Sequence, residues 1–263
     1  MVRGVAHLGL TWPVVMAGAA RLARPVALGI GALVVIEWAV LAAHAGQAVG
    51  VDFAQYRDHV ERFLHGGGLY LPWQFDGPYE IVPARVGQLD HASPPLYPPW
   101  IVVLVAPFLV LPHVLWWLVP AGVVGYVLWR LQPGAWAWAA IAVLALYPRT
   151  PIAVLYGNPV IWATAALAAG MLWRWPAVLV LIKPSLLPFA LVGAQSRSWW
   201  IALALVAVAS LAMLPLWPDF VTAMTNAQAT TLHGVDYLTG EWPAAVALVI
   251  AGLSRAGARQ GPR

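Results

Sequence analysis

The chain has 263 residues, of which 62% are hydrophobic and only 9% are charged. A soluble domain of this length needs far more polar surface, so the composition excludes an ordinary soluble enzyme and predicts a protein dissolved in lipid. The formal net charge of +4 does not indicate a nucleic-acid partner, because the basic residues stand singly at the ends of apolar segments. The absence of cysteine excludes disulfide bonds and thiolate metal sites.

The first segment long enough to cross a bilayer runs from Pro25 to Ala45. Arginines at positions 3, 21 and 24 precede it, which predicts a cytoplasmic N-terminus. A cleaved signal peptide is the alternative, because Ala43-His44-Ala45 resembles a cleavage site. The long leading segment and Glu37 within the apolar run disfavour that alternative.

Residues 46–98 are polar and rich in glycine and proline, and we expect them to form a large extracytoplasmic loop. The loop contains most of the acidic residues of the chain: Asp52, Asp58, Glu61, Asp76, Glu80 and Asp90. Its first part, from Asp52 to His65, has apolar residues at helical spacing, and Gly66-Gly67-Gly68 would end the helix. The apolar residues are Phe53, Tyr56, Val60 and Leu64. We predict an amphipathic helix that lies along the membrane surface.

The segment from Pro98 to Leu131 is apolar but interrupted by prolines at 107, 112 and 120, which predicts one broken span or a tight hairpin. Further apolar runs cover 134–148, 158–173, 176–193, 198–216 and 242–254. Several are shorter than a full span, which predicts tilted, broken or re-entrant helices. Residues 176–193 are the expected re-entrant hairpin, with Lys183-Pro184 near its tip. Residues 217–241 are the expected second extracytoplasmic loop.

Together these segments predict an all-α fold. The chain would form a single domain over residues 1–263, a polytopic transmembrane helical bundle of about 7–8 membrane segments in the cell membrane. The arginines agree with this topology, because nine fall on the cytoplasmic side and four outside. All acidic residues except Glu37 fall outside, so any site built on them is extracytoplasmic.

Asp52 is the first candidate for chemistry. It follows the first span by a few residues, so its carboxylate should lie at the outer membrane boundary, where a base acting on lipid-linked substrates belongs. The spacing equally allows a structural role, because Asp52 with Gln55 three residues later has the pattern of a helix N-cap with its capping box.

Other candidates lie at the ends of later segments. Tyr97 stands in the rigid stretch from Ser93 to Trp100 that enters the membrane, where simple anchoring is the alternative role. Arg149 and Asn158 belong to a short external connection that offers a cation and an amide. Arg149 could bind a phosphate, or it could only cap a helix end.

Two ionisable residues lie inside apolar runs, where a charge is costly unless it meets a partner or a water-filled cavity. Lys183 is followed by proline and is a functional candidate for this reason, whereas for Glu37 we favour a structural role. His233 is a single histidine in the second external loop. The sequence has no HExxH, P-loop or other metal or nucleotide motif, so we expect neither a metal nor a cofactor.

In this order, the features resemble glycosyltransferase family 87, polytopic transferases of the GT-C type that use polyprenyl-phosphate sugars as donors. The resemblance extends from about residue 25 to 241 and rests on five short elements. These are Val51-Asp52-Phe53, Gly68-Leu69-Tyr70, Tyr97-Pro98-Pro99, Gly157-Asn158 and Ile182-Lys183-Pro184. The family usually has Gly-Gln where this chain has Gly157-Asn158.

The resemblance implies a glycosyltransferase that moves a sugar from a polyprenyl-phosphate donor to a lipid or glycan acceptor, with mannose the first candidate and another hexose or a pentose the alternatives. Asp52 would be the general base that takes the proton of the acceptor hydroxyl. Residues that bind the donor phosphate or the substrate would be His233, Arg149, Lys183, Tyr97 and Asn158. Two other functions remain open: a transporter or flippase of lipid-linked intermediates, built on Glu37 and Lys183, and an inactive, truncated relative.

Overall fold

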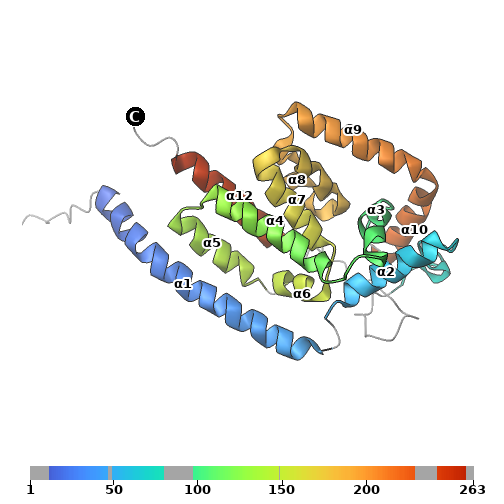
Figure 1. Ribbon diagram of the computed structural model, residues 1–263, viewed down its shortest axis with the longest axis horizontal. Helices are drawn as coiled ribbons and strands as arrows, with labels where there is room; N and C mark the ends of the chain where they lie inside the picture. The colour runs from blue at the N-terminus through green and yellow to red at the C-terminus, as the bar shows by residue number, and fades with distance from the viewer. Residues whose placement is uncertain (1–11, 47–48, 80–96, 148, 229–241, 259–263) are drawn as a thin grey trace, which may run out of the picture.

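The computed structural model describes residues 12–46, 49–79, 97–147, 149–228 and 242–258, and all regular elements in these ranges are helical. Figure 1 shows the long helix α1 (Trp12–Ala45) along one edge of the molecule and α9 (Arg197–Ala212) along the opposite edge. Four helices lie between these edges: α4 (Leu115–Leu131), α5 (Ala135–Ala145), α7 (Val160–Trp173) and α12 (Trp242–Ala258). The predicted all-α fold is confirmed for the described residues.

Helix α7 is the centre of the bundle. It packs against α4, α12 and the segment η5 (Trp175–Ile182), and most of its residues are buried. Small side chains allow this close packing, because a Cβ on Gly170 would lie 2.7 Å from the Cβ of Ala177 in η5. Small residues at helix interfaces allow backbones to approach closely. The small residues of α7 therefore allow it to pack against all of these neighbours.

Helix α2 (Val51–Leu64) follows α1 after a sharp turn at Gly50, whose φ of 77° is the left-handed region that favours glycine. The predicted helix from Asp52 is confirmed. Phe53, Tyr56 and Val60 are buried, but Leu64 is exposed. The capping role considered for Asp52 is wrong, because the N-cap is Gly50 and Asp52 lies inside the first turn.

The predicted interruption between Pro98 and Leu131 is confirmed. Helix α3 (Ile101–Val105) continues into η4 (Ala106–Leu109), and α4 begins only at Leu115, after the turn that contains Pro112. Proline lacks the amide hydrogen and breaks the helical ladder there, whereas Pro120 is accommodated within α4. His113 in this turn holds α2, because its Nε2 lies 2.7 Å from the Nη1 of Arg57 and its ring packs on Phe53.

Residues 175–193 form a hairpin, as the apolar run with its central Lys183-Pro184 predicts. η5 runs to Ile182, and the chain returns through η6 (Pro184–Leu186), α8 (Leu187–Ala190) and η7 (Leu191–Gly193), which pack against η5. The two ends meet, because a Cβ on Gly193 would collide with the carbonyl of Arg174. Lys183 is therefore at the tip.

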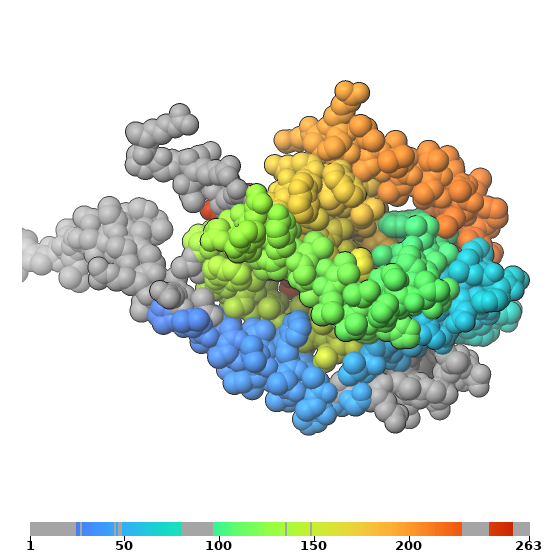
Figure 2. Space-filling model, in the orientation of Figure 1, coloured from blue at the N-terminus to red at the C-terminus, as the bar shows by residue number. Residues whose placement is uncertain are grey.

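The first loop and the helix after α9 form one end of the molecule. Helix α10 (Trp217–Gln228) follows α9 through η8 (Leu214–Leu216), and Figure 2 shows its orange atoms meeting the cyan atoms of the first loop. Tyr79 donates its hydroxyl to the carbonyl of Ala223 at 2.8 Å, and Asn226 donates to the carbonyl of Gln74 at 2.7 Å. The first loop and helix α10, which are far apart in sequence, therefore contact each other directly.

Within the described residues, no single helix has both the length and the apolar content required to cross a membrane. Two helix pairs meet these criteria only together, each with a bend at its break: α5 with α6 (Arg149–Tyr156), at 66°, and α9 with the helical residues 214–227, at 72°. The exposed surface is nevertheless rich in large apolar side chains, and Leu28 of α1 and Leu205 of α9 are each about two-thirds exposed.

Candidate functional site

The candidate site is organised by a hydrogen bond between Asp52 and Asn158, residues 106 positions apart in sequence. Asn158 donates its Nδ2 to the Oδ2 of Asp52 at 2.7 Å, and Asp52 is half-buried. The carboxylate lies in the first turn of α2, the end of a helix at which acidic side chains are stabilising. A half-buried carboxylate held by a hydrogen bond is suited to accept a proton from a bound hydroxyl.

The amide of Asn158 has only one orientation that satisfies its neighbours. Its Oδ1 accepts the backbone N–H of Val160 at 3.0 Å, at the start of α7. Because a backbone N–H can only donate, the oxygen must face Val160 and the Nδ2 must face Asp52. The hydrogen bond from Val160 at the start of α7 therefore orients the Nδ2 donor of Asn158 toward the Asp52 carboxylate.

Tyr97 completes the hydrogen-bonded chain. Its hydroxyl donates to the Oδ1 of Asn158 at 2.5 Å, and the side chain is fully buried. The ring packs edge-on against Tyr56 of α2, with 5.2 Å between ring centroids. Tyr97 is therefore held from both sides and links the entry of the α3 segment to α2 and α7.

Lys183 reaches the same cluster from the hairpin tip. Its Nζ lies 4.6 Å from the centroid of the Tyr97 ring, within the range of a cation–π interaction, and only 3% of the residue is exposed. Lys183, Tyr97, Asn158 and Asp52 thus form a continuous group of contacts, which we call the Asp52 cluster. Four of the six residues expected to form the site lie in it.

Gly157 positions the cluster through its backbone. Its φ of 70° lies in the left-handed region, and a Cβ there would lie 2.7 Å from the Trp117 ring and 2.9 Å from the Cβ of Phe53. Trp116 donates its indole N–H to the Gly157 carbonyl at 2.8 Å, and Trp117 donates to Val154 at 2.7 Å. The Gly157-Asn158 turn is therefore clamped against α4.

Two expected site residues are not in the cluster. Arg149 is exposed at the first residue of α6, whereas Asn158 follows the last residue of that helix. The expectation that Arg149 contributes to this site stays a prediction, and Arg149 lines a small pocket together with Val160 and Ile161 at the start of α7. His233 lies outside the described residues.

Charged residues further along α2 contact the chain that follows this helix. Arg62 donates to the carbonyls of Gly68 and Leu69 and lies 2.7 Å from the Nδ1 of His59, so it holds the chain as it leaves the helix. Burial lowers the pKa of Arg62, an effect that neighbouring Asp58 opposes. Burial likewise raises the pKa of Asp58, against the attraction of Arg57. These arginines are engaged with α2 and its loop.

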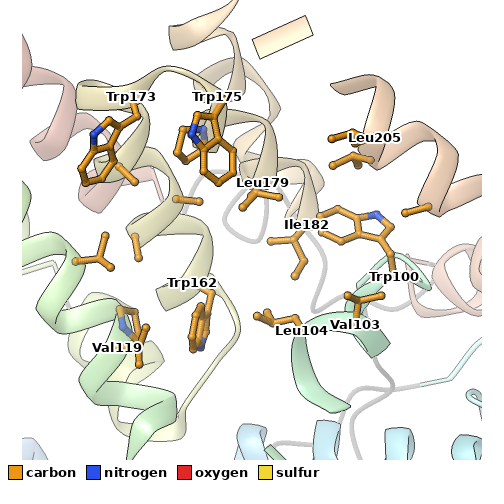
Figure 3. Close-up of a pocket in the computed structure, with 18 residues that line it drawn as sticks. Trp100, Val103, Leu104, Val119, Trp162, Trp173, Trp175, Leu179, Ile182 and Leu205 are labelled. Carbon is orange, nitrogen blue, oxygen red and sulfur yellow. The ribbon is translucent and has the colours of Figure 1, made fainter. Parts of the chain in front are cut away.

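An apolar cavity of about 570 Å³ is lined by residues of α7, and we call it the α7 cavity. Figure 3 shows Trp162, Trp173, Trp175 and Trp100 around an open centre. The cavity extends along α7 from Trp162, one turn after Asn158, to Trp173. This corresponds to ~16 Å at ~1.5 Å per helical residue. Ile182 in its wall precedes Lys183 in the chain.

Removing the Tyr97 hydroxyl tests whether the cluster stabilises the fold. Tyr97→Phe keeps the ring that contacts Tyr56 and Lys183 but removes the donor to Asn158. We expect a loss of roughly 1 kcal/mol in the free energy of unfolding, the usual net value of one hydrogen bond. Thermal unfolding in detergent measures it, with exposed Tyr147→Phe as the control. Equal melting temperatures for both variants would contradict a stabilising role.

Sequence reasoning did not identify the residues that enclose the site. The spacing of apolar residues places Tyr56 only on an apolar helix face, and nothing within the apolar run distinguishes the clamping indoles of Trp116 and Trp117. Across the described ranges, no group of three or more His, Asp or Glu side chains is placed to hold a metal ion. Comparisons with protein-family models, curated proteins and solved structures find no match.

Proposed function

We propose that the protein is a membrane glycosyltransferase that transfers a sugar, with mannose the first candidate, from a polyprenyl-phosphate donor to a lipid or glycan acceptor. The observation that carries the proposal is the half-buried Asp52 carboxylate, held by Asn158 at the start of α7, in a fold where the same helix lines an apolar cavity. A transferase for lipid-linked sugars requires this combination, because its reactive atoms are polar and its donor carries a long hydrocarbon chain.

A membrane location is supported by the exposed apolar side chains of α1, α4 and α9. Lipid is the solvent in which such a surface costs no free energy, since hydrocarbon tails are as apolar as leucine. The protein would then be a multi-pass helical bundle in the cell membrane, with its N-terminus in the cytoplasm. Asp52, α10 and the first loop would lie on the extracytoplasmic side, where polyprenyl-phosphate sugars are used.

In the proposed reaction, the hydroxyl oxygen of the acceptor attacks the anomeric carbon of the donor sugar, and Asp52 takes the proton of that hydroxyl. The bond from that carbon to the phosphate oxygen breaks, and its electron pair leaves with polyprenyl phosphate. General bases of this kind typically contribute roughly 10²–10⁴-fold to the rate. Because Asn158 holds Oδ2, the carboxylate presents a fixed direction to the acceptor.

The departing phosphate needs cations or hydrogen-bond donors around it. Lys183 supplies a buried cation within the cluster, and Trp162 has an indole N–H that is buried without an acceptor. An oxygen of the donor phosphate would accept a hydrogen bond from this indole N–H. The hydrocarbon chain of the donor would then follow the α7 cavity toward Trp173, where the walls are almost entirely apolar.

The direct test uses purified wild-type protein in nanodiscs with radiolabelled polyprenyl-phosphate mannose and a membrane lipid extract. We expect label to move into a new lipid or glycan product. Nucleotide-linked mannose is the matched control and should give no product, because the apolar cavity offers no site for a soluble nucleotide. Failure of transfer with mannose and with other polyprenyl-phosphate sugars, from folded protein, would refute the transferase.

A further inference from the structure

Three exposed arginines stand where helices end or begin. Arg130 lies in the last turn of α4, Arg174 follows the last residue of α7, and Arg197 is the first residue of α9. None of their side chains forms an ion pair within the described residues, whose acidic side chains belong to α1, α2, the first loop and α10. The three positive charges are therefore uncompensated in this part of the chain.

Contacts between aromatic rings bring the ends of α4 and α7 together. In their first turns, the ring centroids of Trp116 and Trp162 lie 5.5 Å apart. Toward their last residues, the ring centroids of Tyr126 and Trp173 lie 6.0 Å apart. The two helices therefore run in the same direction and end side by side. The Asp52 cluster lies at their other end, ~21 Å away for the 14 residues of α7 at ~1.5 Å each.

The start of α9 reaches the same end through the hairpin. A Cβ on Gly193 would collide with the carbonyl of Arg174 and lie 2.6 Å from the Trp199 ring of α9. Figure 3 shows Trp173 and Trp175, which flank Arg174 in the chain, together at one side of the α7 cavity. Both are about half exposed. The arginines thus stand among tryptophan rings, the side chains typical of a membrane–water interface.

The Arg130 guanidinium is held in one position by Tyr126. Its Nη1 donates to the Tyr126 hydroxyl at 3.1 Å, and its Cζ lies 5.9 Å from the ring centroid, within the range of a cation–π interaction. Tyr126 is itself fixed by Trp173, because the two rings stack with an interplanar angle of 8°. A guanidinium has five N–H donors, so most of those of Arg130 stay available to a ligand in a fixed direction.

Resting on the membrane location proposed above, we infer that this end of α4 and α7 binds the phosphate of an anionic phospholipid. Guanidinium groups match the geometry of phosphate oxygens, and basic clusters at a membrane surface recognise anionic lipids. In the proposed topology the site faces the cytoplasm, on the opposite side from Asp52. Charge complementarity selects a phosphate, and the half-exposed tryptophans select a lipid, since a soluble phosphate would leave their rings in water.

The dipole of α4 gives Arg130 another possible role, because a cation in the last turn of a helix is favoured. That role requires the charge of Arg130 but neither its contact with Tyr126 nor the stack on Trp173. A lipid site requires the charge and the contacts that hold it. The two roles therefore differ in whether the effect of Arg130 depends on the lipid that is supplied.

Two variants disturb the site, and a third is the matched control. Arg130→Gln removes the charge, whereas Tyr126→Leu keeps it but removes the hydroxyl and the ring that hold it. Arg149→Gln removes the same charge from another exposed arginine, but Arg149 lines a pocket at the start of α7, the other end of that helix. All three side chains are exposed, so each variant should fold.

Native mass spectrometry of the detergent-purified protein counts the bound lipids. We expect wild type to retain phosphatidylglycerol several-fold more than phosphatidylcholine with the same chains. Arg130→Gln and Tyr126→Leu should remove this preference, and Arg149→Gln should keep it. Equal retention of both lipids by wild type, or an equal loss of preference in Arg149→Gln, would overturn the inference. Displacement of the lipid by excess glycerol phosphate would indicate a site for soluble anions and would overturn it as well.

Thermal unfolding supplies the second readout. Phosphatidylglycerol should raise the melting temperature of wild type by several degrees relative to phosphatidylcholine, because a ligand of the folded state stabilises it. Arg130→Gln should melt at the same temperature in both lipids. If Arg130→Gln instead melted below wild type by the same amount in both, Arg130 would act on its helix alone and the inference would be overturned. Neither measurement requires sugar transfer, so this inference and the proposed transferase can fail independently.

Discussion

Asp52→Asn is expected to lower sugar transfer by roughly 10²–10⁴-fold, the usual contribution of a general base. The substituted amide has almost the same shape as the carboxylate, and its oxygen can still accept the Nδ2 of Asn158, which lies 2.7 Å from Oδ2 in the native protein. It cannot take a proton from the acceptor hydroxyl. The initial rate at saturating donor measures the loss, and thermal unfolding should change little.

Asp58→Asn is the matched control for this experiment. Asp58 lies on the same helix, is half-buried and loses the same charge on substitution, but it follows Asp52 by six residues. Burial raises its pKa, so the neutral amide is well tolerated there, and we expect transfer within a few-fold of wild type. Wild-type transfer by Asp52→Asn would exclude Asp52 as the base.

The transport alternative predicts a different result for Asp52→Asn. A flippase would depend on Glu37 and Lys183, the ionisable residues within apolar segments, and would tolerate Asp52→Asn. Their positions differ in the fold: Glu37 is half-buried on the edge helix α1, whereas Lys183 is buried at the Asp52 cluster. The position of Lys183 is therefore compatible with either function, and the effect of Asp52→Asn on activity distinguishes the two.

Local patterns predicted the helices well, because the physical causes are local. Apolar runs located α5, α7, α9 and α12, and prolines located the interruption before α4. The Lys183-Pro184 pair marked a hairpin tip, since proline cannot continue a helical ladder. Boundaries were less certain: α1 begins at Trp12, well before the predicted Pro25, because a helix can extend beyond its most apolar part.

Contacts between distant segments could not be predicted in the same way. The sequence marks Asp52 and Asn158 as separate candidates, but the residues around each do not predict the hydrogen bond between them. Arg149 begins α6 and Asn158 follows the end of that helix, so the role of this arginine in the same site stays a prediction. The indoles of Trp116 and Trp117 have the composition of any membrane-interface tryptophan, so their clamping role appears only when α4 meets the Gly157 turn.

Gly157→Ala is expected to destabilise the fold by about 3 kcal/mol and to disorganise the site. The new Cβ would occupy a left-handed backbone position at φ 70° and overlap the Trp117 ring and Phe53, so the Asn158 amide would move away from Asp52. Thermal unfolding and transfer measure both effects. Gly122→Ala in α4 is the control: its Cβ meets nothing within 4 Å, and helix propensity predicts a slight gain. Equal melting temperatures for the two variants would show that the Gly157 turn does not fix the cluster.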